Sequence, residues 1–157
     1  MKPRIEKKDA FRVLGVEDDA VKIDTEDPGF QDLWMNRFMS QHEEIKPHST
    51  DGAHYGVFFN TSGTDLTGER YLAGMAVDLD TPAPEGWVTR DIPAAEYAVF
   101  DTSLREIGET SNKALSKWLP GSKFEQDTSI PRFDFHPPGT KGQDSLVSVW
   151  IPIKRRQ

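Results

Sequence analysis

The fold can be read outward from the stretch Ala95-Glu96-Tyr97-Ala98-Val99-Phe100. Its β-branched and aromatic residues are typical of a β-strand. A helix is predicted next, because Ser103 precedes Glu106 by the spacing of a capping box and apolar residues then recur at helical intervals as far as Trp118. Pro120-Gly121 then ends this helix.

Two more strands complete this half of the chain, and the first half repeats the order of elements. The strands at 131–136 and 146–151 are separated by a turn rich in proline and glycine. In the first half we expect a strand at 10–16, a helix at 27–41 with Asp27 as its N-cap and Pro28 in its first turn, and strands at 55–60 and 71–77 joined by a hairpin loop at 61–68.

The repetition predicts an α+β fold made of two strand–helix–strand–strand units. Corresponding elements are offset by about 75 residues, although residue identity between the halves is low. Chance recurrence of short elements is the alternative. We expect a single domain over 1–157, with repeats at about 1–80 and 87–157 related by a pseudo-two-fold axis. An antiparallel sheet would carry two helices, and a ligand cleft would lie where the halves meet.

The composition is that of a soluble globular protein, with 36% hydrophobic and 29% charged residues. Cysteine is absent, which excludes disulfides, thiolate catalysis and cysteine-based metal sites, and is consistent with a reducing compartment. No apolar run is long enough to span a membrane, and the charged start at 1–8 does not resemble a signal peptide. We therefore expect a cytoplasmic protein.

The net charge of −7 disfavours direct binding to nucleic acid, because the only basic cluster is Lys154-Arg155-Arg156. An acidic protein can instead attract cationic small molecules. No P-loop, dinucleotide fingerprint or nucleophile elbow occurs, so no cofactor and no catalytic residue are assigned. No metal site is expected either, since the spacing of the four histidines fits no common zinc pattern: His42, His48, His54 and His136.

One acidic residue stands in an unusual place. Asp134 lies between Phe133 and Phe135 in a short predicted strand, where aspartate is uncommon. Alternation places Asp134 on the same side as Arg132 and His136. That side could face solvent, or Arg132 or His136 could supply an internal counter-charge. If it lines a cleft, the buried carboxylate has a raised pKa or accepts a cation, and aromatic faces strengthen cation binding.

The large aromatic residues are candidates for the wall of such a pocket. Tyrosine and tryptophan combine an apolar face with a polar tip, so they can line a cavity that binds a charged molecule. The alternative is ordinary core packing. Strand alternation also places Phe135 opposite to Asp134. The candidate wall residues are Tyr55, Tyr71, Trp118, Phe135 and Trp150.

Several segments, taken in order, carry a resemblance to a known family. These segments are Pro3–Glu6, Phe11–Gly15, Leu33-Trp34, Tyr55–Val57, Tyr71–Gly74, Ile92–Phe100, Trp118–Pro120, Pro131–His136 and Val149–Lys154. With them, the chain resembles the GyrI-like effector-binding domains, the small-molecule sensors of AraC/Rob-type and multidrug MerR-type regulators, which also occur as stand-alone proteins.

The resemblance implies two strand–helix–strand–strand repeats and an aromatic pocket at their interface with a central acid. The family usually has glutamate at this position, where this chain has Asp134, and an aromatic residue where it has His136. Ser148 replaces an acid often found in the closing strand. Some stand-alone relatives are linked to gyrase inhibition, and others hydrolyse cyclopropane-containing compounds with a glutamate and a tyrosine.

These observations predict a stand-alone module that binds or sequesters hydrophobic, cationic small molecules, with Asp134 balancing the charge. A separate transcription regulator or gyrase is the candidate protein partner, and neither nucleic acid nor membrane is expected as a direct partner. One alternative is a hydrolase of strained electrophiles, with Asp134 as general base and Tyr55 or Tyr71 as acid. The other is a gyrase-inhibitor-like interaction protein. We expect binding rather than catalysis, because aspartate replaces the catalytic glutamate.

Overall fold

The computed structural model describes residues 2–19, 37–39, 41–59, 70–140, 142 and 144–156. Antiparallel strands dominate this part of the chain, and one α-helix accompanies them. The strands are β1 (Arg4–Lys8), β2 (Phe11–Asp19), β3 (His54–Phe59), β4 (Arg70–Val77), β5 (Val88–Ile92), β6 (Ala95–Ser103), β7 (Phe124–Gln126), β8 (Arg132–His136) and β9 (Leu146–Arg155). The helical segments are η2 (His42–Glu44), η3 (Lys46–His48), α1 (Ile107–Lys113) and its π-helical continuation η4 (Ala114–Trp118).

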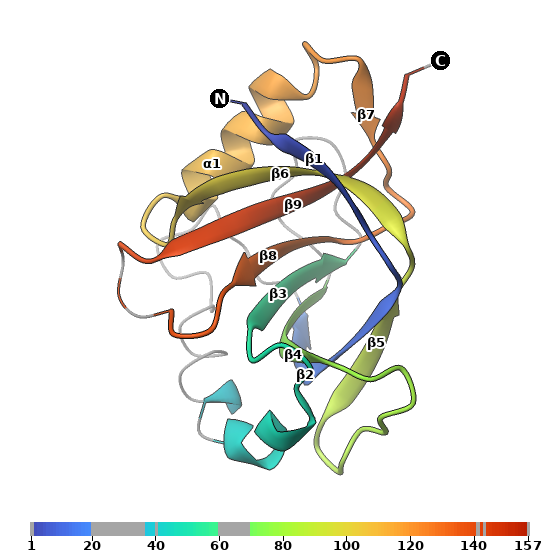
Figure 1. Cartoon of the computed structure of the whole chain (residues 1–157), viewed down its shortest axis with the longest axis vertical. Helices are drawn as coiled ribbons and strands as arrows, with labels where there is room; N and C mark the ends of the chain where they lie inside the picture. Colours follow the sequence, from blue (N-terminus) through green and yellow to red (C-terminus); the bar gives the residue numbers. More distant parts are fainter. Residues whose placement is uncertain are drawn as a thin grey trace.

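The strands form one sheet in the order β1-β6-β9-β8-β3-β4-β2-β5, and β7 pairs with β9 off this path. Every pairing is antiparallel. The order is symmetric about the junction of β8 and β3, because β9 and β6 follow β8 as β4 and β2 follow β3. Figure 1 shows α1 lying against the β6–β9 end of this sheet. The predicted α+β class is confirmed.

At each end of the sheet, the outermost strand comes from the other half of the chain. β1 pairs with β6 of the second half, and β5 pairs with β2 of the first half. Lys8 of β1 lies opposite Ala95 of β6, and Phe11 of β2 lies opposite Ile92 of β5. The strand pairs on the two sides of the β1–β2 and β5–β6 connections therefore have the same register. This reciprocal pairing is what a pseudo-two-fold axis through the β8–β3 junction requires. The repeat boundaries at about 1–80 and 87–157 remain a prediction.

The described residues contain all the predicted strands and three further strands, whereas some other predicted elements lie outside them. The six predicted strands are present as β2, β3, β4, β6, β8 and β9, whereas β1, β5 and β7 were not predicted. Ser103 Oγ accepts the N–H of Glu106 at 3.3 Å, but α1 begins only at Ile107. Most of the predicted helix 27–41 and the whole loop 61–68 lie outside the described residues.

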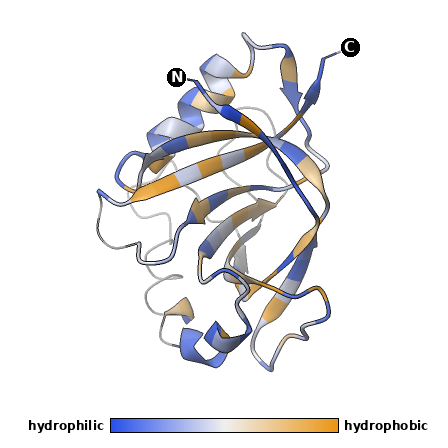
Figure 2. Ribbon diagram, in the orientation of Figure 1, coloured by the Kyte–Doolittle hydropathy of each residue, from blue (hydrophilic) through white to orange (hydrophobic). Residues whose placement is uncertain are grey.

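The sheet has two faces, which we name by one residue each. The Asp134 face also carries Gly56, Tyr71 and Val149, and α1 with η4 packs on it against β6 and β9. The Trp150 face carries Tyr55, Phe133 and Tyr97, which form an aromatic cluster. Apolar residues gather on the central strands, whereas α1 is largely polar, as Figure 2 shows. Within the described residues, no helix is long and apolar enough to cross a bilayer.

One close approach between strands depends on glycine. Gly15 of β2 lies opposite Gly74 of β4, and a Cβ on Gly15 would overlap the backbone of Ala73 and Gly74. A side chain at Gly15 therefore has no space unless the two strands separate.

We predict that Gly15→Ala lowers the free energy of unfolding by about 3 kcal/mol, the upper range for overpacking a core. Gly108→Ala is the matched control, because no atom lies within 4 Å of a Cβ at this position in α1. It should raise stability by up to ~1 kcal/mol through helix propensity. Urea unfolding followed by circular dichroism measures both, and equal effects of the two substitutions would contradict the packing account.

Candidate functional site

Asp134 lies at the centre of the sheet, on β8. It is paired with Gly56 of β3 on one side and with Val149 of β9 on the other. The residue is 8% exposed, and its Oδ1 atom has no hydrogen-bond partner among the described residues. Burial raises the pKa of the Asp134 carboxyl to about 7, against the opposing effect of Arg132. Of the alternatives left open by the sequence, the solvent-exposed position is excluded.

Arg132 supplies part of the counter-charge and is itself buried, with 1% exposure. Its guanidinium carbon lies 4.1 Å from the centroid of the Phe58 ring, a cation–π geometry. Phe58 is the residue opposite Arg132 in the pairing of β3 with β8. Because the pKa of Asp134 stays raised despite this neighbour, desolvation outweighs the attraction of Arg132. The carboxyl therefore retains the capacity to gain from a second cation.

Tyr71 brings a hydroxyl to the same part of the sheet. Its ring packs on Phe58 with centroids 4.8 Å apart, and its Oη atom lies over Gly56, where a Cβ would overlap it. Gly56 is the direct cross-strand neighbour of Asp134, and side chains at such positions lie close together. The absence of a side chain at Gly56 thus lets Tyr71 reach across β3 towards Asp134.

Two histidines lie next along the same strands. His54 and His136 face each other across the pairing of β3 with β8. Burial lowers the pKa of His136 to about 4, with a further contribution from His54, and burial also lowers the pKa of His54. Both imidazoles are therefore neutral at pH 7 and add no positive charge beside Asp134. The described residues contain no group of three acids or histidines placed to hold a metal ion.

The structure places three of the other predicted wall residues on the face opposite to Asp134. Tyr55, Phe135 and Trp150 lie on the Trp150 face, so the sheet stands between their side chains and the Asp134 carboxyl. Trp118 ends η4 and packs on Phe100 with ring centroids 5.4 Å apart.

Of the predicted wall residues, Tyr71 lies over Gly56, the neighbour of Asp134, and Trp118 packs on the same face against Phe100. The predicted wall residues do not include Phe58 or His54. Each lies two residues from Gly56 along β3, so strand alternation places both on the same face as Gly56.

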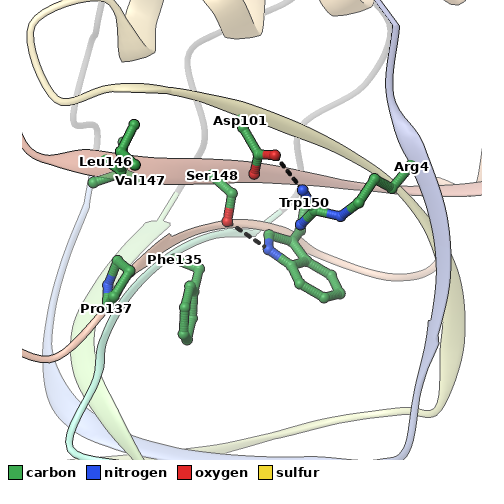
Figure 3. A pocket seen from close by; sticks show the side chains of 8 residues that line it. All are labelled: Arg4, Asp101, Phe135, Pro137, Leu146, Val147, Ser148 and Trp150. Atoms are coloured by element: carbon green, nitrogen blue, oxygen red, sulfur yellow. Dashed lines mark hydrogen bonds and ion pairs between the residues drawn. The ribbon is translucent and has the colours of Figure 1, made fainter.

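A separate cavity of about 350 Å³ opens on the Trp150 face. Figure 3 shows Trp150 and Phe135 beside it, with Arg4 and Asp101 forming an ion pair and the Trp150 indole N–H donating to Ser148 Oγ at 2.9 Å. The Asp134 carboxyl is not part of its lining. The residues around this Trp150 cavity are Arg4, Asp101, Phe135, Pro137, Leu146, Val147, Ser148 and Trp150.

Residues 4–153 match the family described as integron-associated effector binding protein. The chain belongs to this family. The match confirms the resemblance to GyrI-like effector-binding domains that the sequence motifs indicated. Small-molecule binding is therefore the general role of the domain.

A curated relative is the transcriptional regulator BrlR of Pseudomonas aeruginosa. It is 28% identical over 159 residues, which cover 98% of this chain and 56% of that protein. The chain thus spans about half the length of this relative.

Solved structures share the fold at low sequence identity. SAV2435 bound to tetraphenylphosphonium has a TM-score of 0.76 at 11% identity, covering 98% of this chain and 94% of that chain. An integron cassette protein from the mobile metagenome of Vibrio cholerae has a TM-score of 0.58 at 14% identity, covering 98% and 97%. The domain therefore has the GyrI-like fold.

The buried carboxyl should make stability depend on pH in a defined direction. The pKa of Asp134 is about 7 in the folded protein and about 4 in an unfolded chain, so wild type loses stability as pH rises between these values. We predict that Asp134→Asn is more stable than wild type at pH 8, by at most about 4 kcal/mol. The difference should shrink towards pH 5. Urea unfolding at both pH values measures it, and a difference independent of pH would contradict the raised pKa.

Proposed function

We propose that the domain binds hydrophobic cations on the Asp134 face and that Asp134 is the charge-balancing group. The carrying observation is a buried carboxyl with an Oδ1 atom that has no hydrogen-bond partner among the described residues. A desolvated carboxylate is costly, and a cation that reaches it offsets this cost more than it would in water. The related fold of SAV2435 bound to tetraphenylphosphonium supports the same class of ligand.

The surrounding groups favour a cation with an apolar surface. Tyr71 and Phe58 offer aromatic rings beside the acid, and the neutral His54 and His136 add no repulsion. Arg132 lies over the Phe58 ring, with its guanidinium carbon 4.1 Å from the ring centroid. Aromatic contacts of this kind each contribute about 0.5–2 kcal/mol to cation binding. A hydrated metal ion would gain little from such walls.

The same site supports binding better than turnover. Of the two tyrosines considered as general acids, Tyr55 lies on the Trp150 face, where it donates its hydroxyl hydrogen to Asp51 at 2.7 Å. Tyr71 lies on the Asp134 face, but no feature of the described site indicates that a strained electrophile is its substrate.

We infer that binding of the ligand is signalled to the transcription machinery, since the relative BrlR is a transcriptional regulator. A cytoplasmic location, supported by the lack of cysteine, would suit this role.

Binding of a permanent cation should strengthen as Asp134 loses its proton. With a pKa of about 7 in the free protein, the affinity for tetraphenylphosphonium should rise roughly tenfold per pH unit below pH 7 and level off above it. Isothermal titration between pH 5.5 and 8.5 measures this. A flat profile for wild type would contradict the proposed role of the carboxylate.

Asp134→Asn should weaken tetraphenylphosphonium binding at pH 8 by about 10- to 100-fold, the range expected for losing one charge-assisted contact. It should also remove the pH dependence. Asp101→Asn is the matched control, since Asp101 is an exposed acid on the other face and should leave the affinity within about twofold. Triphenylphosphine oxide, a neutral analogue, should not distinguish Asp134→Asn from wild type. If the Asp134→Asn variant keeps wild-type affinity for the cation, Asp134 is not the charge-balancing group.

A further inference from the structure

Asp101, the acid at the Trp150 cavity, has a counterpart in the first half of the chain. β1 and β2 are connected by two residues (9–10), as are β5 and β6 (93–94), and aligning these connections places Arg90 of β5 at the position of Glu6 of β1. Glu17 in β2 likewise corresponds to Asp101 in β6. The two sets of strands can therefore be compared residue by residue.

In the first half, a guanidinium is bound to the equivalent acid. Arg90 donates to both carboxylate oxygens of Glu17, each at 2.8 Å, and its guanidinium carbon lies 5.5 Å from the centroid of the Phe59 ring. The Glu17 side chain is only 3% exposed. This arrangement combines a bidentate ion pair with an aromatic contact on the cation, which are the two interactions that favour guanidinium over ammonium.

In the second half, the acid is present but no arginine stands at the position of Arg90. Glu6 stands in the position of Arg90, so no guanidinium extends from there, and the Asp101 side chain is 62% exposed. Trp150 and Phe135 provide the aromatic surface. The space of about 350 Å³ is within the range of small-molecule pockets.

The charge at the rim favours a positive occupant. Arg4 contacts Asp101 and lies 3.7 Å from Glu6, so one cation stands between two acids. The Arg4 and Asp101 side chains are both exposed, and ion pairs of this type are weak enough to rearrange around a ligand. An anion would meet two carboxylates for one guanidinium.

We propose that the Trp150 cavity is a second small-molecule site, which takes a flat monocation with an amidinium or guanidinium group and an attached aromatic ring. The charged group would bond to Asp101 as Arg90 bonds to Glu17, and the ring would lie against Trp150 and Phe135. The site is on the opposite face of the sheet from Asp134, so its occupancy does not depend on the function proposed above.

Benzamidine is the probe, titrated into the full chain while the indole N–H signal of Trp150 is followed by NMR. We expect saturable shifts of this signal and a loss of affinity of at least about fivefold in Asp101→Asn. Asp134→Asn should change the affinity by less than about twofold, because the sheet separates the two sites. Benzoate has the same shape and the opposite charge, and should not bind.

A double substitution tests the internal analogy directly. Arg4→Val with Glu6→Arg copies Val88 and Arg90 of the first half into β1. This variant should remain folded and lose benzamidine binding, because its own guanidinium fills the cavity. Glu6→Gln is the control and should keep the affinity within about threefold.

Three results would overturn the proposal: no saturable shift of the Trp150 signal with benzamidine, binding of benzoate in its place, or binding that is lost in Asp134→Asn and retained in Asp101→Asn. The last result would assign benzamidine to the Asp134 face. The tetraphenylphosphonium titration tests that face independently, so failure of one proposal can be told from failure of the other.

Discussion

The pairing of β3 with β8 holds the two halves of the sheet together and sets the faces of its central strands. Its register places Gly56 opposite Asp134. Because side chains alternate across a strand, this register sends Asp134 to one face and Phe133 and Phe135 to the other. A slip of one residue would exchange the faces and place the acid in the aromatic cluster. Both the core and the candidate site follow from this single alignment.

The same alignment makes the centre of the sheet energetically unfavourable in the absence of a ligand. A carboxyl with a pKa of about 7 favours the protonated form in the folded protein, so its ionised form reduces stability. Natural binding sites often sacrifice stability in this way, since the groups that recognise a ligand are left partly unsatisfied without it. Tyr71, Phe58 and Gly56 frame the acid, and the neighbouring strands fix them in place.

The duplicated topology also shows how equivalent positions can diverge. Pairing of β1 with β6 and of β5 with β2 gives each half an acid on the Trp150 face. Arg90 pairs with the buried Glu17 in the first half, whereas Glu6 stands at the equivalent position in the second half, where Asp101 is exposed at the Trp150 cavity. Related strands thus carry opposite charges beside equivalent acids.

Much of the architecture was predictable because it rests on local patterns. The alternation in 95–100, 131–136 and 146–151 identified strands, and the spacing of apolar residues identified the helix before Pro120. The strands β1 and β5 escaped prediction, because Arg4–Lys8 and Val88–Ile92 are short and carry several charged residues. They are strands because each pairs with a long strand of the other half, which is a non-local effect.

Local strand geometry is enough to place Asp134 on the same face as Arg132 and opposite to its phenylalanine neighbours, because side chains alternate within a few residues. It could not determine which distant side chains share that face. The tertiary structure decided that Tyr71 joins Asp134 while Tyr55 and Trp150 lie behind the sheet, because strand order and register arise from packing between segments far apart in the chain.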